Sequence, residues 1–139
     1  MKKYLLLAIA AFSSSSFAGT AYIAEWRQHS HVHTCFNVSN TSNVDVGVTI
    51  KLYDQNGDIF TGTTTQSGKL NSEFTLTGKS TIQLCVPASS NSNFGFGTIT
   101  SRPINESDTG VFLVARGVIS DVTSKNKWQT VTINGGNPF

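Results

Sequence analysis

Three alternating histidines near the start of the chain are the side chains best suited to bind a metal ion. His29, His31 and His33 are two residues apart, so in a β-strand all three would project from one face. Imidazole is the commonest side-chain ligand for metals, and a zinc or copper ion could bridge two of these rings. No nearby cysteine pair or carboxylate pair completes a tetrahedral set, which leaves a solvated polar face as the competing interpretation. The three histidines therefore stand as a candidate metal site.

The residue types that catalysis needs are not arranged as a catalytic site. All the histidines lie within five residues of one another, and no serine stands in a Gly-x-Ser-x-Gly elbow. His33 and Cys35 share a strand face and resemble a thiol–imidazole pair, but an oxidised cysteine has no thiol to offer. The sequence therefore predicts no enzyme, no catalytic residue and no cofactor.

The first eighteen residues have the pattern of an export signal that is cleaved off. Two lysines precede an uncharged run over residues 4–12, and small residues occupy the positions that a signal peptidase recognises. The uncharged run is much shorter than the ~20 residues that a helix needs to cross a bilayer. We therefore interpret residues 1–18 as a signal peptide and residues 19–139 as a single domain. The predicted location is secreted or at the cell surface, with the periplasm as second choice.

The remaining chain is neutral and poor in charge. Charged residues make up 13% of the sequence, against about 25% in an ordinary soluble protein. Without the two lysines of the signal, eight basic and eight acidic side chains remain. Nucleic-acid affinity comes mostly from neutralised phosphates, and attraction to anionic lipid needs basic clusters, so neither partner is expected. No later stretch is apolar and long enough to span a membrane.

The two cysteines are expected to form one disulfide bond. Cys35 and Cys85 allow a single intramolecular pair, and an exported chain meets an oxidising compartment. In both segments the cysteine alternates with a row of apolar residues, so its side chain points to the opposite strand face. This parity predicts a bridge between neighbouring strands across the outer surface of one sheet. A bridge through the core, as in antibody domains, would need the inward parity.

Apolar residues recur at every second position along most of the chain after the signal. From Val44 to Leu52 five apolar side chains alternate with polar ones, and a turn over residues 54–57 follows. Similar runs cover residues 81–86 and 128–133, and no window of eleven or more residues keeps a helical period. Eight or nine short strands separated by Gly, Asn and Ser predict an all-β fold, an antiparallel immunoglobulin-like sandwich.

The first of these strands carries the candidate residues for assembly. Alternation places Tyr22 and Trp26 on one strand face and Ile23 on the other. In a monomer this segment is simply the first strand, near an edge. Alternatively, it pairs with the open edge of a neighbouring subunit, and a head-to-tail repeat of that contact yields a filament. Low charge weakens the usual protection of such edges.

One strand and its turn resemble a known family. The run Val48-Thr49-Ile50-Lys51-Leu52-Tyr53-Asp54, followed by Asn56-Gly57, resembles the strand–turn core of bacterial secreted immunoglobulin-like domains of the FxLYD type. Ile50 stands where the family has its first phenylalanine. The resemblance implies a secreted β-sandwich and carries over no functional residue. Usher-assembled pilins are similar in export, size and single disulfide, but the residues 137–139 do not match their terminal signature.

These observations predict an exported, non-catalytic structural or adhesive subunit. It would self-associate by edge-strand pairing into a surface filament or an extracellular biofilm matrix, with Tyr22, Ile23 and Trp26 as anchors. The alternative is a monomeric periplasmic or secreted binding module. Its ligand would be a divalent metal ion or a glycan, held by the histidines or by exposed aromatic side chains.

Overall fold

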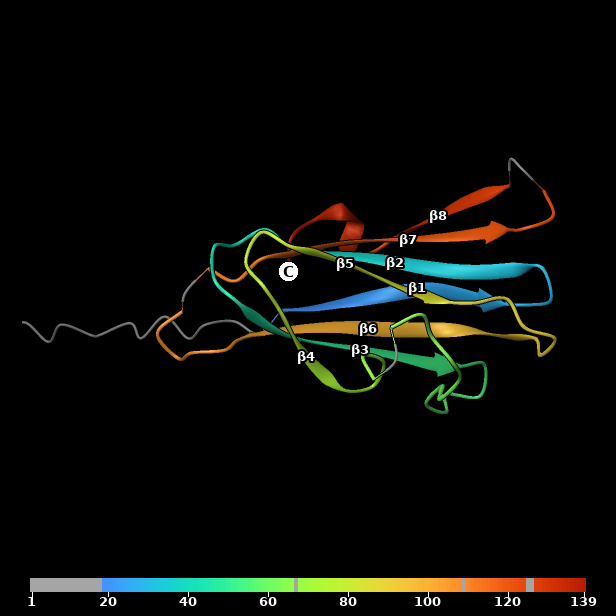
Figure 1. The fold of residues 1–139 in the computed structure, drawn as a ribbon, viewed down its shortest axis with the longest axis horizontal. Coiled ribbons are helices and arrows are strands. Elements are labelled where there is room, and N and C mark those ends of the chain that lie inside the picture. Colours follow the sequence, from blue (N-terminus) through green and yellow to red (C-terminus); the bar gives the residue numbers. More distant parts are fainter. Residues whose placement is uncertain (1–18, 67, 109, 125–126) are drawn as a thin grey trace, which may run out of the picture.

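Two four-stranded antiparallel β-sheets pack face to face around the hydrophobic core (Figure 1). The structure is a computed structural model that describes residues 19–66, 68–108, 110–124 and 127–139, so the predicted signal peptide lies outside the described residues. The strands are β1 (Thr20–Gln28), β2 (Val32–Asn40), β3 (Val46–Asp54), β4 (Glu73–Leu76), β5 (Thr81–Val86), β6 (Asn93–Pro103), β7 (Leu113–Asp121) and β8 (Trp128–Thr132). A short 3-10 helix, η1 (Asn134–Gly136), follows β8. The predicted antiparallel sandwich of eight or nine strands is confirmed.

The order of the strands places the first strand in an unusual position. One sheet has the order β1-β6-β3-β4 and the other β5-β2-β7-β8. The pairs β2–β5 and β3–β6 correspond to strands B–E and C–F of an immunoglobulin sandwich. In that fold the last strand lies beside F, whereas here β1 lies beside β6 and β7 lies beside β2. The four edge strands are therefore β1, β4, β5 and β8.

The two-residue alternation builds the core as predicted. On β3 the side chains of Val46, Val48, Ile50 and Leu52 are fully buried, while Lys51 is exposed between them. The inward rows of β2 and β5 face the same interior. Burying each such side chain contributes roughly 1.5–3 kcal/mol, so the alternation itself selects which face of each sheet points inward. Among the described residues there is no helix with the length and apolarity that a membrane span requires.

A buried amide ties together the end of the sandwich at which β2 finishes. Asn40 is 2% exposed, and its Nδ2 donates to the carbonyl oxygens of Val44, Leu76 and Thr77 at 2.8, 3.1 and 3.2 Å. Its Oδ1 accepts hydrogen bonds from the backbone N–H and the hydroxyl of Ser42. One side chain thus joins the β2–β3 connection to the turn between β4 and β5.

The disulfide joins Cys35 on β2 to Cys85 on β5, directly opposite each other on neighbouring strands of one sheet. The predicted pairing and its position across a single sheet are confirmed. The backbone N–H of Cys85 donates to Thr65 Oγ1, and its carbonyl accepts from the N–H of Thr65, both at 2.9 Å. Cys85 therefore turns its backbone groups away from β2, as in a pair that exchanges no ladder bonds, where the two strands approach most closely. The same two bonds cover the outer edge of β5 at this point.

Replacing both cysteines with serine is expected to lower the free energy of unfolding by about 4 kcal/mol, because the unfolded chain regains the freedom of a loop with a sequence separation of 50. Urea denaturation followed by tryptophan fluorescence measures the change. Ser39→Ala with Thr81→Ala is the matched control, since it removes a 2.8 Å hydroxyl contact between the same strands, for a loss of about 1 kcal/mol. Equal losses in both double variants would contradict the covalent constraint as the source.

Candidate functional site

The assembly residues predicted on β1 are divided between the core and the surface. Ile23 and Trp26 are 1% and 0% exposed, whereas Tyr22 is 69% exposed. The prediction that Trp26 shares a face with Tyr22 is wrong. Ile23 lies opposite Gly97 and Trp26 lies opposite Gly95. Between these two pairs β1 advances by three residues, whereas β6 advances by two. This β-bulge adds one residue and reverses the alternation, which turns Trp26 inward beside Ile23.

Trp26 connects three separate segments of the chain. Its indole Nε1 donates to the carbonyl oxygen of Tyr53 at 2.9 Å, and its ring lies 4.6 Å from that of Phe60, centroid to centroid. The strand opposite must be bare at this point, because a Cβ on Gly95 would lie 1.9 Å from that same Tyr53 oxygen. The indole therefore joins β1 to the end of β3 and to the loop that follows β3.

The side chains of Ala21, Ile23 and Trp26 fill the inner side of an edge strand, and we call the space that they occupy the β1 slot. The ladder bonds of β1 run to β6 on one side only. On the other side β1 meets the second sheet at an isolated bridge between Ile23 and Ile133. Nearby, Gln129 Nε2 donates to a carboxylate oxygen of Glu25 at 3.3 Å. The slot therefore lies between β6 and the β8 end of the opposite sheet.

The three histidines do not share one strand face as predicted. The backbone groups of His29 and Val32 bond to each other at 3.0 and 3.1 Å, so Ser30 and His31 form a two-residue turn between β1 and β2. Only His33 lies in β2. Within the described ranges no three side chains of His, Cys, Asp or Glu come together as a set that could hold a metal ion. The predicted arrangement fails because the strand ends inside the histidine run.

His33 instead faces a hydroxyl group on the neighbouring strand. Its Nε2 lies 2.7 Å from the Oγ of Ser120, which is directly opposite on β7. Ser120 is 4% exposed, and neither residue lines the two hollows described next. This hydroxyl–imidazole contact is therefore interpreted as a cross-strand pair within the sheet.

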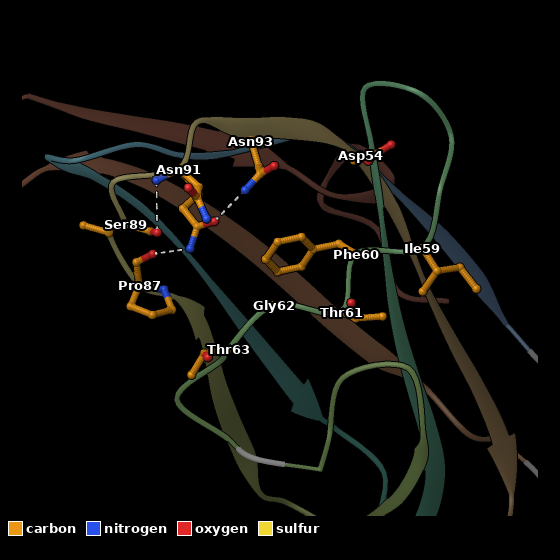
Figure 2. Close-up of a pocket in the computed structure, with 12 residues that line it drawn as sticks. Asp54, Ile59, Phe60, Thr61, Gly62, Thr63, Pro87, Ser89, Asn91 and Asn93 are labelled. Atoms are coloured by element: carbon orange, nitrogen blue, oxygen red, sulfur yellow. Dashed lines mark hydrogen bonds between the residues drawn. The ribbon is translucent and has the colours of Figure 1, made fainter.

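A polar hollow of about 500 Å³ lies at the end of the sandwich, between the loop after β3 and the loop before β6 (Figure 2). We call it the loop-end pocket. Gln28, at the end of β1, is only 6% exposed and is held at both ends of its amide. Its Nε2 donates to the carbonyl oxygen of Pro87 at 2.8 Å, and its Oε1 accepts from Asn93 Nδ2 at 3.0 Å. Figure 2 shows the ring of Phe60 between the two loops.

A second hollow shares Gln28 and Asn93 with the loop-end pocket. Its volume is about 550 Å³, and its other lining residues include Arg27, His29 and Phe94. Arg27 forms an ion pair with Glu25, which also lines this hollow. The Gln28–Asn93 amide pair therefore lies where the two hollows meet.

Sequence reasoning missed Gln28, Phe60 and Asn93. Gln28 precedes the histidines and looks like an ordinary surface amide, although its spacing of two from Trp26 places it on the inward face once the bulge is known. Phe60 follows the predicted turn by only three residues, too few to show an alternation. The side chains of Phe94 and Phe96 are both exposed on the outer side of β6, and the ring of Phe96 stacks on that of Tyr53 at a centroid distance of 5.0 Å.

The carboxyl groups with shifted pKa values lie outside both hollows. Hydrogen bonds from Arg102 on β6 lower the pKa of Glu73 on β4, where the two side chains meet over Gly47 of β3. The hydroxyl and the backbone N–H of Thr123 lower the pKa of Asp121 at the end of β7. Both shifts follow from local hydrogen bonds that hold the carboxylate charged, which suits a structural contact rather than proton transfer.

The division of β1 between core and surface makes a direct prediction about stability. Trp26→Ala and Ile23→Ala are expected to lower the free energy of unfolding by about 3–5 and 2–5 kcal/mol, because each leaves a cavity in the β1 slot. Tyr22→Ala is the matched control on the same strand and should stay within about 0.5 kcal/mol of the parent. Urea unfolding measures all three. A loss at Tyr22 as large as that at Trp26 would contradict the bulge.

No protein-family model, curated protein or solved structure matches this chain. The resemblance to FxLYD-type domains therefore stays a prediction, and the interpretation of function depends on the geometry described above.

Proposed function

We propose that the protein is a non-catalytic, exported subunit that self-associates by exchanging β1 between copies, building a surface filament or an extracellular matrix. One observation carries this proposal. Three core side chains, those of Ala21, Ile23 and Trp26, belong to an edge strand whose backbone ladder bonds run only to β6. The covalent link from β1 to β2 is a turn of two residues. The strand is thus well bound in the slot and weakly tied to its own chain.

The closed and exchanged forms would contain the same contacts. A β1 strand from another copy would make the same ladder with β6 and bury the same three side chains, so the two forms differ mainly at the turn between β1 and β2. Exchange of an identical element is a low-cost route to association for this reason. If each copy donates its strand to one neighbour and receives a strand from another, the contact does not close and a filament grows.

The turn itself supports an opening hinge. Neither Ser30 nor His31 has a positive φ. This excludes the type I′ and II′ turns, whose twist matches the right-handed twist of two paired strands in a hairpin. Unprimed turns splay the strands that they join, and β1 and β2 do diverge into different sheets (Figure 1). If Ser30 and His31 adopted an extended backbone, β1 would continue in line with β2, away from its own sheet, and would reach a neighbouring copy.

Two of the other three edge strands, and the disulfide, are compatible with this assignment. Thr65 covers part of the outer edge of β5, and β4 is only four residues long, so both offer little for strand addition. Charge repulsion between copies is weak, because basic and acidic side chains balance after the predicted signal. A disulfide bond fits an oxidising location such as the cell surface or the exterior.

Exchange can be trapped with two variants that each add one free cysteine and keep the Cys35–Cys85 disulfide. Tyr22 and Thr98 lie opposite each other on β1 and β6, so Tyr22→Cys on one chain and Thr98→Cys on another can meet only if strands are exchanged. The two proteins are unfolded in urea at acidic pH, where thiol–disulfide exchange is slow, then mixed, refolded and oxidised. We expect a linked heterodimer on a non-reducing gel, identified by mass spectrometry.

The control for this experiment pairs Tyr22→Cys with Thr75→Cys. Thr75 is exposed on β4, three strands away from β1 in the same sheet, so random collision links it as readily as Thr98. No excess of the Tyr22–Thr98 product over this control would overturn strand exchange.

A matched pair of proline variants tests the hinge. Ser30→Pro fits the first central position of an unprimed turn and removes no ladder bond, so it should hold the closed form. His31→Pro disfavours the helical backbone region for Ser30 and extends the hinge, so it should favour assembly. Light scattering after size exclusion is expected to show a monomer for Ser30→Pro and larger assemblies, visible by negative-stain microscopy, for His31→Pro. Identical or reversed behaviour would contradict the hinge.

A further inference from the structure

The two hollows at the loop end combine amide groups with apolar side chains. Each primary amide has two N–H donors and an oxygen with two lone pairs. Gln28 uses one donor on Pro87 and one lone pair on Asn93, so its buried amide keeps one of each for a ligand. The exposed hydroxyl groups of Thr61 and Thr63 lie in the same pocket. A ligand here would meet groups that both donate and accept hydrogen bonds.

The charged residues of both hollows are already engaged within the protein. Asp54 is the only charged residue lining the loop-end pocket, and its Oδ1 accepts backbone N–H groups of Asn56 and Asp58 at 2.8 and 3.1 Å. In the second hollow the charges of Glu25 and Arg27 neutralise each other. The combined lining therefore offers no unpaired lysine or arginine to an acidic ligand, which favours a neutral ligand over an acidic one.

Apolar surface is exposed next to these polar groups. Ile59 and Phe94 are 51% and 54% exposed and line the first and second hollow respectively. Sugar rings match this mixture, because their hydroxyl groups donate and accept while their C–H faces are apolar and favour contact with hydrophobic and aromatic side chains. Two adjoining hollows of about 500 and 550 Å³ have room for several linked sugar units rather than one.

We propose that the loop end of the sandwich binds a neutral oligosaccharide across the Gln28–Asn93 amide pair. The buried amide of Gln28 is held in one orientation by its two partners, so little conformational freedom is lost when a ligand binds. This inference does not depend on strand exchange. Gln28 belongs to β1, and whichever copy supplies β1 would place the same amide between the same two loops.

Ligand-observed saturation-transfer NMR tests binding without regard to the size of the assembly. The probes are neutral hexasaccharides of glucose, mannose and N-acetylglucosamine, with a hexagalacturonate as the charged comparison. We expect saturable binding of at least one neutral probe at concentrations up to about 10 mM, and none of the acidic probe. Binding of the acidic probe alone, or of no probe, would overturn the proposal.

Two aspartate variants locate the site. Asn93→Asp replaces the amide N–H that donates to Gln28 with a charged acceptor. We expect this variant to bind the neutral oligosaccharide about tenfold more weakly, as measured by calorimetry. Asn37→Asp is the matched control, since Asn37 is also half-buried in a strand and also bonded to a glutamine, Gln83, at 3.0 Å. The affinity of Asn37→Asp for the oligosaccharide should equal that of the parent protein. Equal affinity in both variants would place the ligand elsewhere and overturn the assignment.

Thr61→Val serves as a second site variant if Asn93→Asp fails to fold. It removes an exposed hydroxyl from the loop-end pocket and leaves the Gln28 amide pair intact, and we expect a several-fold loss of affinity. Circular dichroism and urea unfolding establish the fold of every variant. The same titration on Ser30→Pro, the variant that is expected to be monomeric, separates the two proposals. Unchanged affinity for the sugar in this monomer would show that the sugar site does not require strand exchange, whereas loss of binding would contradict the independence of the two proposals. An unchanged affinity in folded Thr61→Val, together with unchanged affinity in Asn93→Asp, would exclude this pocket.

Discussion

The indole of Trp26 is the contact on which the loop end of the sandwich depends. It reaches the core only because a bulge inserts one residue into β1 and because Gly95 leaves room opposite. Once inside, it bonds to the end of β3 and packs against Phe60. Phe60 is the buried aromatic of the loop-end pocket, so the same side chain anchors the edge strand and supports the wall of the pocket. The bulge is therefore a structural requirement of both proposed roles rather than a defect in the strand.

Much of the fold follows from the alternation of apolar residues, because each sheet has one buried face and one wet face. Val46 to Leu52 and Ile82 to Val86 point where that pattern predicts. The disulfide followed from the same parity, since each cysteine stands at the parity opposite to the apolar row of its strand. These inferences succeeded in strands that run without interruption.

The errors occur where a single residue breaks the alternation. The extra residue between Ile23 and Trp26 has no special composition, and the turn at Ser30 and His31 lacks the Asn-Gly or Asp-Gly signal of a hairpin. The pocket was missed for a different reason. Its residues come from the end of β1 and from two loops distant in sequence, and only the folded sheets bring Gln28, Phe60 and Asn93 together.

The amide of Asn40 has a consequence for how long the fold lasts. Asparagine side chains deamidate slowly to aspartate, and a protein that is exported as proposed would be beyond the reach of cytoplasmic turnover. A carboxylate at this position would face the carbonyl oxygens of Val44, Leu76 and Thr77 with no N–H to offer them. Deamidation of this one buried group would therefore loosen the end of the sandwich opposite the loop-end pocket, and the hydrogen bonds that hold the amide in place act as the brake on that ageing reaction.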